Sequence, residues 1–133
     1  MKKRTMKFLY SISAALFLLL TAALPAEATQ NWTQVYAHVE QMINKGVEQY
    51  NNGDLEGAKK IINDSYYGVY ENDGLEKAIR TTISSKNANL TEYQYSELKK
   101  AIRENRGKDA VRGEADKLLS CLLYTSPSPR DTR

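Results

Sequence analysis

The stretch AKKIINDSYYGVYENDGLEKAI, residues 58–79, decides the fold that the sequence predicts. Apolar and aromatic residues recur through it at steps of three and four, the spacing that places side chains on one face of an α-helix. The short acidic turn at residues 71–76 then leads into a second predicted helix over residues 75–83. The stretch therefore predicts two packed helices, and the apolar face of the first consists of Leu55, Ala58, Ile62, Tyr66 and Val69.

The segments on either side repeat the helical period, and none alternates apolar and polar residues as a half-buried strand does. A first helix is predicted over residues 32–50, ended by the sequence Asn51-Asn52-Gly53, and Asp54 is expected to cap the next helix. Such short gaps favour antiparallel neighbours. The sequence thus predicts an all-α fold, an antiparallel helical bundle of about four to five helices.

The second half of the bundle is predicted in less regular segments. Residues 84–88 are expected to form a polar loop, and Asn89 with Glu92 has the spacing of a capping box for a fourth helix. That helix would end at Gly107, and a fifth helix would begin near Val111. The core face expected for the fourth helix consists of Leu90, Tyr93, Leu98, Ala101 and Ile102.

Three carboxylates lie within the acidic turn, and two interpretations of them stay open. In the first, Asp73 is the N-cap of the helix at residues 75–83 and Glu76 is its N3 residue, which together form a capping box. In the second, Glu71, Asp73 and Glu76 are metal ligands, because carboxylate oxygens bind hard cations such as iron without thiolate or imidazole. The two interpretations do not exclude each other.

Residues 64–71, DSYYGVYE, followed by GLEKAI at residues 74–79, resemble the extracytoplasmic segment that precedes the membrane core in many bacterial FTR1-family iron permeases. The pattern there is close to A-Y-F-x-x-F-E, two further residues, and then G-[LM]-E-x-A. Glu71, Gly74 and Glu76 match it, and the resemblance extends over about residues 32–119. Three residues depart from the pattern: Ser65 stands in place of Ala, and Tyr67 and Tyr70 stand in place of Phe.

The resemblance implies a fragment of a high-affinity iron permease, namely the exported helical domain in front of the iron-transporting membrane core. Iron would be the bound or transported ion, and acidic residues would capture it. The partners implied are the membrane, reached through that core, and other iron-uptake proteins. The family's R-E-G-L-E motifs lie in membrane helices that this chain lacks, and Asn72 stands where the turn would need Arg, so the permeation role is not transferred to the turn.

Both ends of the chain differ in composition from the predicted bundle. Basic residues precede an apolar run at residues 8–24, and Ala26-Glu27-Ala28 fits a cleavage site, so residues 1–28 are predicted to be a signal peptide, with an uncleaved anchor as the rival. The domain would then span residues 29–119. Residues 120–133, which end in LLYTSPSPRDTR, resemble translated sequencing-adapter read-through, and a disordered Ser/Pro-rich terminus is the rival interpretation.

Composition excludes several classes of function. Residues 29–120 contain 13 basic and 14 acidic residues and no clustered basic face, which argues against nucleic-acid binding. The single Cys121 allows no disulfide framework, and the single His38 is expected on the polar side of the first helix. The chain has neither H-E-x-x-H nor a nucleophile motif, so we expect no enzyme.

The sequence therefore predicts a domain exported across the cytoplasmic membrane, at its extracytoplasmic face. Its predicted function is iron capture in front of a permease core. The alternative is a stand-alone secreted helical binding module of unknown ligand.

Overall fold

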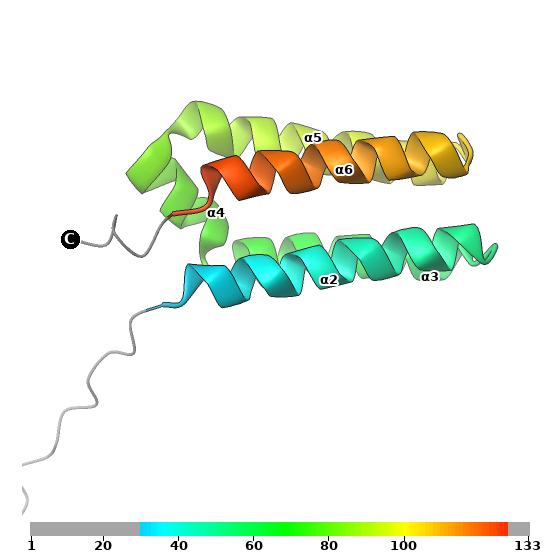
Figure 1. Ribbon diagram of the computed structural model, residues 1–133, viewed down its shortest axis with the longest axis horizontal. Coiled ribbons are helices and arrows are strands. Elements are labelled where there is room, and N and C mark those ends of the chain that lie inside the picture. The colour runs from blue at the N-terminus through cyan, green and yellow to red at the C-terminus, as the bar shows by residue number, and fades with distance from the viewer. Residues whose placement is uncertain (1–29, 128–133) are drawn as a thin grey trace, which may run out of the picture. The chain divides into compact units, whose positions relative to one another are not determined.

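The computed structural model describes residues 30–127, and within them the chain folds as a four-helix arrangement with no strand. Two helices run out and back, α2 (Trp32–Asn51) and α3 (Leu55–Asp64), and α3 continues directly into the π-helix η2 (Ser65–Glu71). After α4 (Leu75–Ala78) and the π-helix η3 (Ile79–Ile83), α5 (Ser85–Arg103) and α6 (Lys108–Thr125) form the second pair. The prediction of an all-α antiparallel bundle is confirmed (Figure 1). The predicted signal peptide, residues 1–28, lies outside the described residues.

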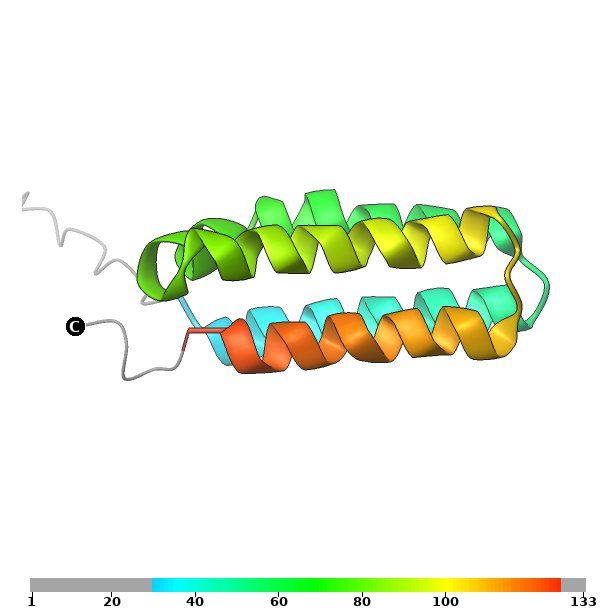
Figure 2. The same cartoon turned by 90° about the horizontal axis from the view of Figure 1, so that it is seen from above.

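The four long helices pack around one core as a square. The pairs α2–α3 and α5–α6 are neighbours along the chain, and the contacts α2–α6 and α3–α5 join the two pairs. Figure 2 shows these joining contacts, with α5 over α3 and α6 over α2. The buried core draws on every element except the turns; its largest fully buried side chains include Tyr70, Tyr95, Ile43, Ile62, Leu98, Ile102, Leu118 and Leu122.

At one end of the bundle, regular helices are closed by local caps, and we call this the capped end. Asp54 caps α3 as predicted, because its Oδ1 accepts the Gly57 N–H at 2.8 Å, and Gly53 before it has φ +87°. The Tyr50 hydroxyl donates to Asn105 Oδ1 at 2.6 Å and accepts the Gly107 N–H at 2.9 Å. The end of α2 is thereby tied to the turn between α5 and α6.

The second half of the bundle corrects two predictions. Residues 84–88 are not a loop, since α5 begins at Ser85 and Ser84 caps it by accepting the Asn87 N–H at 3.1 Å. Asn89 and Glu92 therefore form no capping box and lie inside α5.

The core face of α5 is also rotated from the one predicted. Leu90 and Tyr93 are 46% and 56% exposed, whereas Leu98, Ala101 and Ile102 are buried as expected. The inward positions of the first turns are occupied by small or polar residues, which hydrophobicity alone does not mark. These buried residues are Ala88, Thr91 and Tyr95.

The last helix continues past the predicted domain boundary at Leu119. α6 ends at Thr125, and both Leu122 and Thr125 are buried against the bundle. The interpretation of residues 120–133 as read-through stays a prediction. Within residues 30–127 no helix is long and apolar enough to cross a membrane.

Candidate functional site

At the opposite end of the bundle, two π-helical segments flank the acidic turn. We call the region made by η2, α4, η3 and the first turns of α5 the acidic end, after Glu71, Asp73, Glu76 and Glu92. A π-helix closes its hydrogen bonds over one residue more than an α-helix, and such segments often occur at functional sites. In η2 the wider turns place Ser65, Val69 and Tyr70 in the core. The predicted helix over residues 75–83 consists of α4 followed by η3.

Arg80 joins the elements of the acidic end. Its Nε donates to Glu76 Oε1 at 2.6 Å, its Nη1 to Asn89 Oδ1 at 3.0 Å, and its Nη2 to Glu92 Oε1 at 2.8 Å. These partners lie on α4 and α5, so one guanidinium fixes α4 and η3 against α5. The hydrogen bond to Glu76 raises the pKa of Arg80, and the carboxylates of Glu76 and Glu92 add to the effect. We call these four residues the Arg80 clamp.

A cluster of tyrosines lies against η2 and α5. The ring centroids of Tyr66, Tyr70 and Tyr95 are 5.0–5.7 Å apart in all three pairs, the range in which aromatic rings attract one another. The Tyr95 hydroxyl is satisfied inside the core, because it lies 2.9 Å from Ser65 Oγ. Burial raises the pKa of Tyr95 and outweighs the opposing effect of that hydrogen bond.

The Tyr70 hydroxyl is buried and has no hydrogen-bond partner among the described residues. The nearby Thr91 hydroxyl, which donates to the Asn87 carbonyl at 3.0 Å, lowers the pKa of Tyr70, but burial outweighs this effect. Burial raises the pKa of Tyr70, and the nearby carboxylates of Glu92 and Glu76 raise it further. Tyr70 is therefore a neutral phenol with an unused donor that lies close to two carboxylates. An unsatisfied buried hydroxyl of this kind costs about 1–3 kcal/mol.

The three predicted metal ligands occupy different environments. Glu71 ends η2 and is exposed, Asp73 is exposed in the turn, and Glu76 belongs to the Arg80 clamp. In the part of the chain that the structure describes, no group of three His, Cys, Asp or Glu side chains is close enough to hold a metal ion. Glu71 instead lies beside Tyr66, whose pKa is raised first by burial and then by a hydrogen bond to this carboxylate.

The predicted capping box at Asp73 and Glu76 is wrong. Gly74, not Asp73, is the N-cap of α4, and no side chain caps that helix. Gly74 has φ +83°, a conformation that glycine enters without strain, so the backbone itself turns into α4. Glu76 does not reach back to the cap because it binds Arg80 one turn ahead.

Sequence reasoning did not name Arg80 or Tyr95 as parts of this end, and it gave Asn89 and Glu92 a different role. The spacing of Glu76 and Arg80, four residues apart on one helix, was a usable signal for their ion pair. Nothing in the sequence pairs Arg80 with Glu92, since that contact depends on how α4 and η3 meet α5. His38, predicted on the polar side of its helix, is exposed there.

Comparison of the chain with protein-family models, with curated proteins and with solved structures finds no match.

Proposed function

We propose that this chain is the exported helical domain of an FTR1-type iron permease and that its acidic end captures iron. The observation that carries the proposal is the position of residues 64–79, the segment that resembles FTR1-family permeases. Residues 64–79 supply η2, the turn at Gly74, α4 and the start of η3, and they present Glu71 and Asp73 to solvent at one end of the bundle. Exposed carboxylates are suitable ligands for hard cations.

The ion pairs of the acidic end set the order in which the carboxylates would act. Glu71 and Asp73 form no salt bridge among the described residues, and both are exposed, so an incoming ion can reach them. Glu76 would join them only after releasing Arg80, which keeps Glu92 and Asn89 as partners. Capture in this proposal therefore requires the turn to rearrange, and the Arg80 clamp is the element that moves.

Thermal unfolding of the purified full chain with added ferrous or ferric ion tests iron capture. A ligand that binds only the folded state stabilises it by about 2.7 kcal/mol when its free concentration is about 100 times Kd. We expect the melting temperature of the wild-type chain to rise. The double variant Glu71→Gln with Glu76→Gln should lose that rise while its helix content stays the same.

Glu56→Gln is the matched control. Glu56 lies on α3, is highly exposed and pairs only with Lys59, at 2.7 Å. This variant should keep the whole iron-dependent rise. A wild-type melting curve that neither oxidation state of iron changes would overturn the capture proposal.

The second candidate is a stand-alone secreted binding module. It is favoured by the bundle itself, because the four long helices share one core within the described residues. Long-read sequencing of the source locus across codons 118–133 separates the two candidates. A frame that runs on into several apolar segments of about 20 residues supports the permease, whereas a native stop codon nearby supports the module.

A further inference from the structure

A second site lies away from the acidic turn, in the groove between α3 and α5. Its volume is about 430 Å³, and it is lined by Lys59, Asn63, Ser96, Lys99 and Arg103. Three of these five side chains are cationic, the other two can donate hydrogen bonds, and none is a carboxylate. The groove runs along the contact between α3 and α5, two helices that lie side by side in Figure 2, so its walls are two packed helices.

The positive charge in this groove is only partly neutralised. Lys59 pairs with Glu56 at 2.7 Å, on the same helix. Lys99 and Arg103 form no salt bridge with any residue in the range 30–127. Glu71 acts electrostatically on Lys99, and Arg103 interacts in the same way with Glu104, which is bound to Arg106 at 2.6 Å. Two cations thus face the groove without a partner.

Lys99 is held in place rather than free in solvent. Its ammonium nitrogen lies 4.6 Å from the centre of the Tyr66 ring and 5.3 Å from that of Tyr67, both within the range of a cation–π contact. Burial lowers the pKa of Lys99, and Glu71 opposes this effect. The Lys99 ammonium group is therefore held in place and partly dehydrated. A ligand that binds it has less water to displace.

We propose that the α3–α5 groove binds an elongated oxyanion that carries two or more carboxylate or phosphate groups. Lys99 and Arg103 are one helical turn apart, about 6 Å along the axis, so they can hold two separate groups of one ligand. Arg103 would bind one group through paired N–H donors, and Lys99 the other as a point charge. Asn63 and Ser96 supply neutral donors between the helices. The proposal does not depend on iron capture.

Heteronuclear NMR of the isotope-labelled full chain tests the proposal at constant ionic strength. The probes are citrate, inorganic pyrophosphate and, as a single-group reference, acetate. We expect saturable amide shifts that gather at Lys59, Asn63, Ser96, Lys99 and Arg103 with citrate or pyrophosphate, and much weaker binding of acetate. Whichever of the two binds more tightly identifies carboxylate or phosphate as the preferred group.

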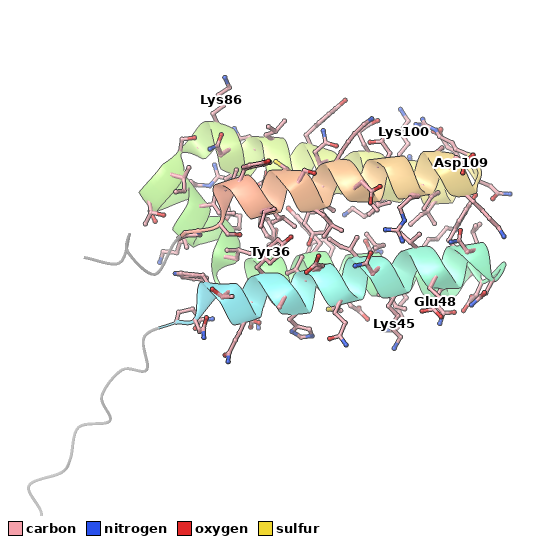
Figure 3. The ribbon with its side chains drawn as sticks, in the orientation of Figure 1. Tyr36, Lys45, Glu48, Lys86, Lys100 and Asp109 are labelled. Atoms are coloured by element: carbon pink, nitrogen blue, oxygen red, sulfur yellow. The ribbon has the colours of Figure 1, made fainter. Side chains whose placement is uncertain are left out.

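Variants separate this site from general attraction to a cationic surface. Lys99→Gln and Arg103→Gln should each weaken binding about tenfold, the usual effect of losing one charge-assisted hydrogen bond. Lys100→Gln is the matched control: Lys100 follows Lys99 on α5 but does not line the groove, and Figure 3 shows it projecting outward. Binding should survive this change. The proposal is overturned by an absence of saturable shifts with both multivalent probes, by shifts centred elsewhere, or by an equal loss in Lys100→Gln.

Discussion

The two ends of the bundle make the turns between antiparallel helices differently. At the capped end, regular α-helices finish in local hydrogen bonds, with Asp54 on the Gly57 N–H and Tyr50 joined to both Asn105 and Gly107. At the acidic end, η2 and η3 interrupt the α-helical hydrogen bonding and α4 has no side-chain cap, although Ser84 caps α5 there. The acidic end also contains a buried hydroxyl without a partner, at Tyr70.

The π-helical turns and the unsatisfied tyrosine hydroxyl lie at the acidic end. Caps and satisfied hydroxyls each stabilise the folded state by about 1 kcal/mol. π-Helical turns and an unsatisfied donor do not, and proteins tend to retain such features where they serve a function. The acidic end is also where exposed carboxylates meet the Arg80 clamp. The contrast between the ends adds support to the proposal that the acidic end binds a ligand.

The largest expected effect is the response of stability to alkaline pH, because the buried tyrosines belong to the acidic end. The pKa of Tyr70 and of Tyr95 is raised above the ordinary value of 10.0, chiefly by burial. Above that pH the unfolded chain releases these protons and the folded chain keeps them, so stability is full below pH 10 and falls as pH rises. Each buried tyrosine contributes a loss of at most about 1.4 kcal/mol per pH unit.

Urea unfolding between pH 8 and pH 11 measures this loss, and the slope should become shallower in Tyr70→Phe. Tyr50→Phe, which removes a hydroxyl at the capped end, is the control, and the change of slope should be confined to the variant at the acidic end. Equal slopes in wild type and Tyr70→Phe would contradict the assignment of this sensitivity to the acidic end.

A comparison of two aspartates gives an intermediate effect. Asp54→Ala removes a side-chain cap and should cost about 1 kcal/mol. Asp73→Ala, at the corresponding turn of the acidic end, should change the free energy of unfolding by less than about 0.5 kcal/mol, because Gly74 and not Asp73 begins α4. Chemical denaturation of both variants measures the contrast. A loss in Asp73→Ala as large as that in Asp54→Ala would restore the capping box that the structure replaces.

The two ends also differ in how far the sequence predicted them. At the capped end, the helix over residues 32–50, its stop at Gly53 and the Asp54 cap were all predicted, because each depends on neighbours along the chain. At the acidic end, the pattern identified the helices but not the π-helical turns or the contact between Arg80 and Glu92. Those features arise from packing between distant segments, and local periodicity does not encode them.

The error in α5 has the same origin. Leu90 and Tyr93 are more hydrophobic than Ala88 and Thr91, so pattern reading placed them in the core. The bundle instead admits small residues where α5 approaches its neighbours and gives the large inward position to Tyr95, which binds Ser65 across the core. Of the predicted metal ligands, Glu76 binds Arg80, Glu71 lies beside Tyr66, and Asp73 is exposed.

The most direct test of whether the acidic end contains a destabilising feature is the free energy of unfolding of Tyr70→Phe, measured beside that of Tyr95→Phe. Tyr95→Phe leaves Ser65 without its partner and should lose about 1 kcal/mol. Tyr70→Phe removes a hydroxyl that has no partner, so we expect stability at neutral pH to stay the same or to increase. A loss in Tyr70→Phe equal to that in Tyr95→Phe would mean that the Tyr70 hydroxyl is satisfied, and would contradict the account of the acidic end.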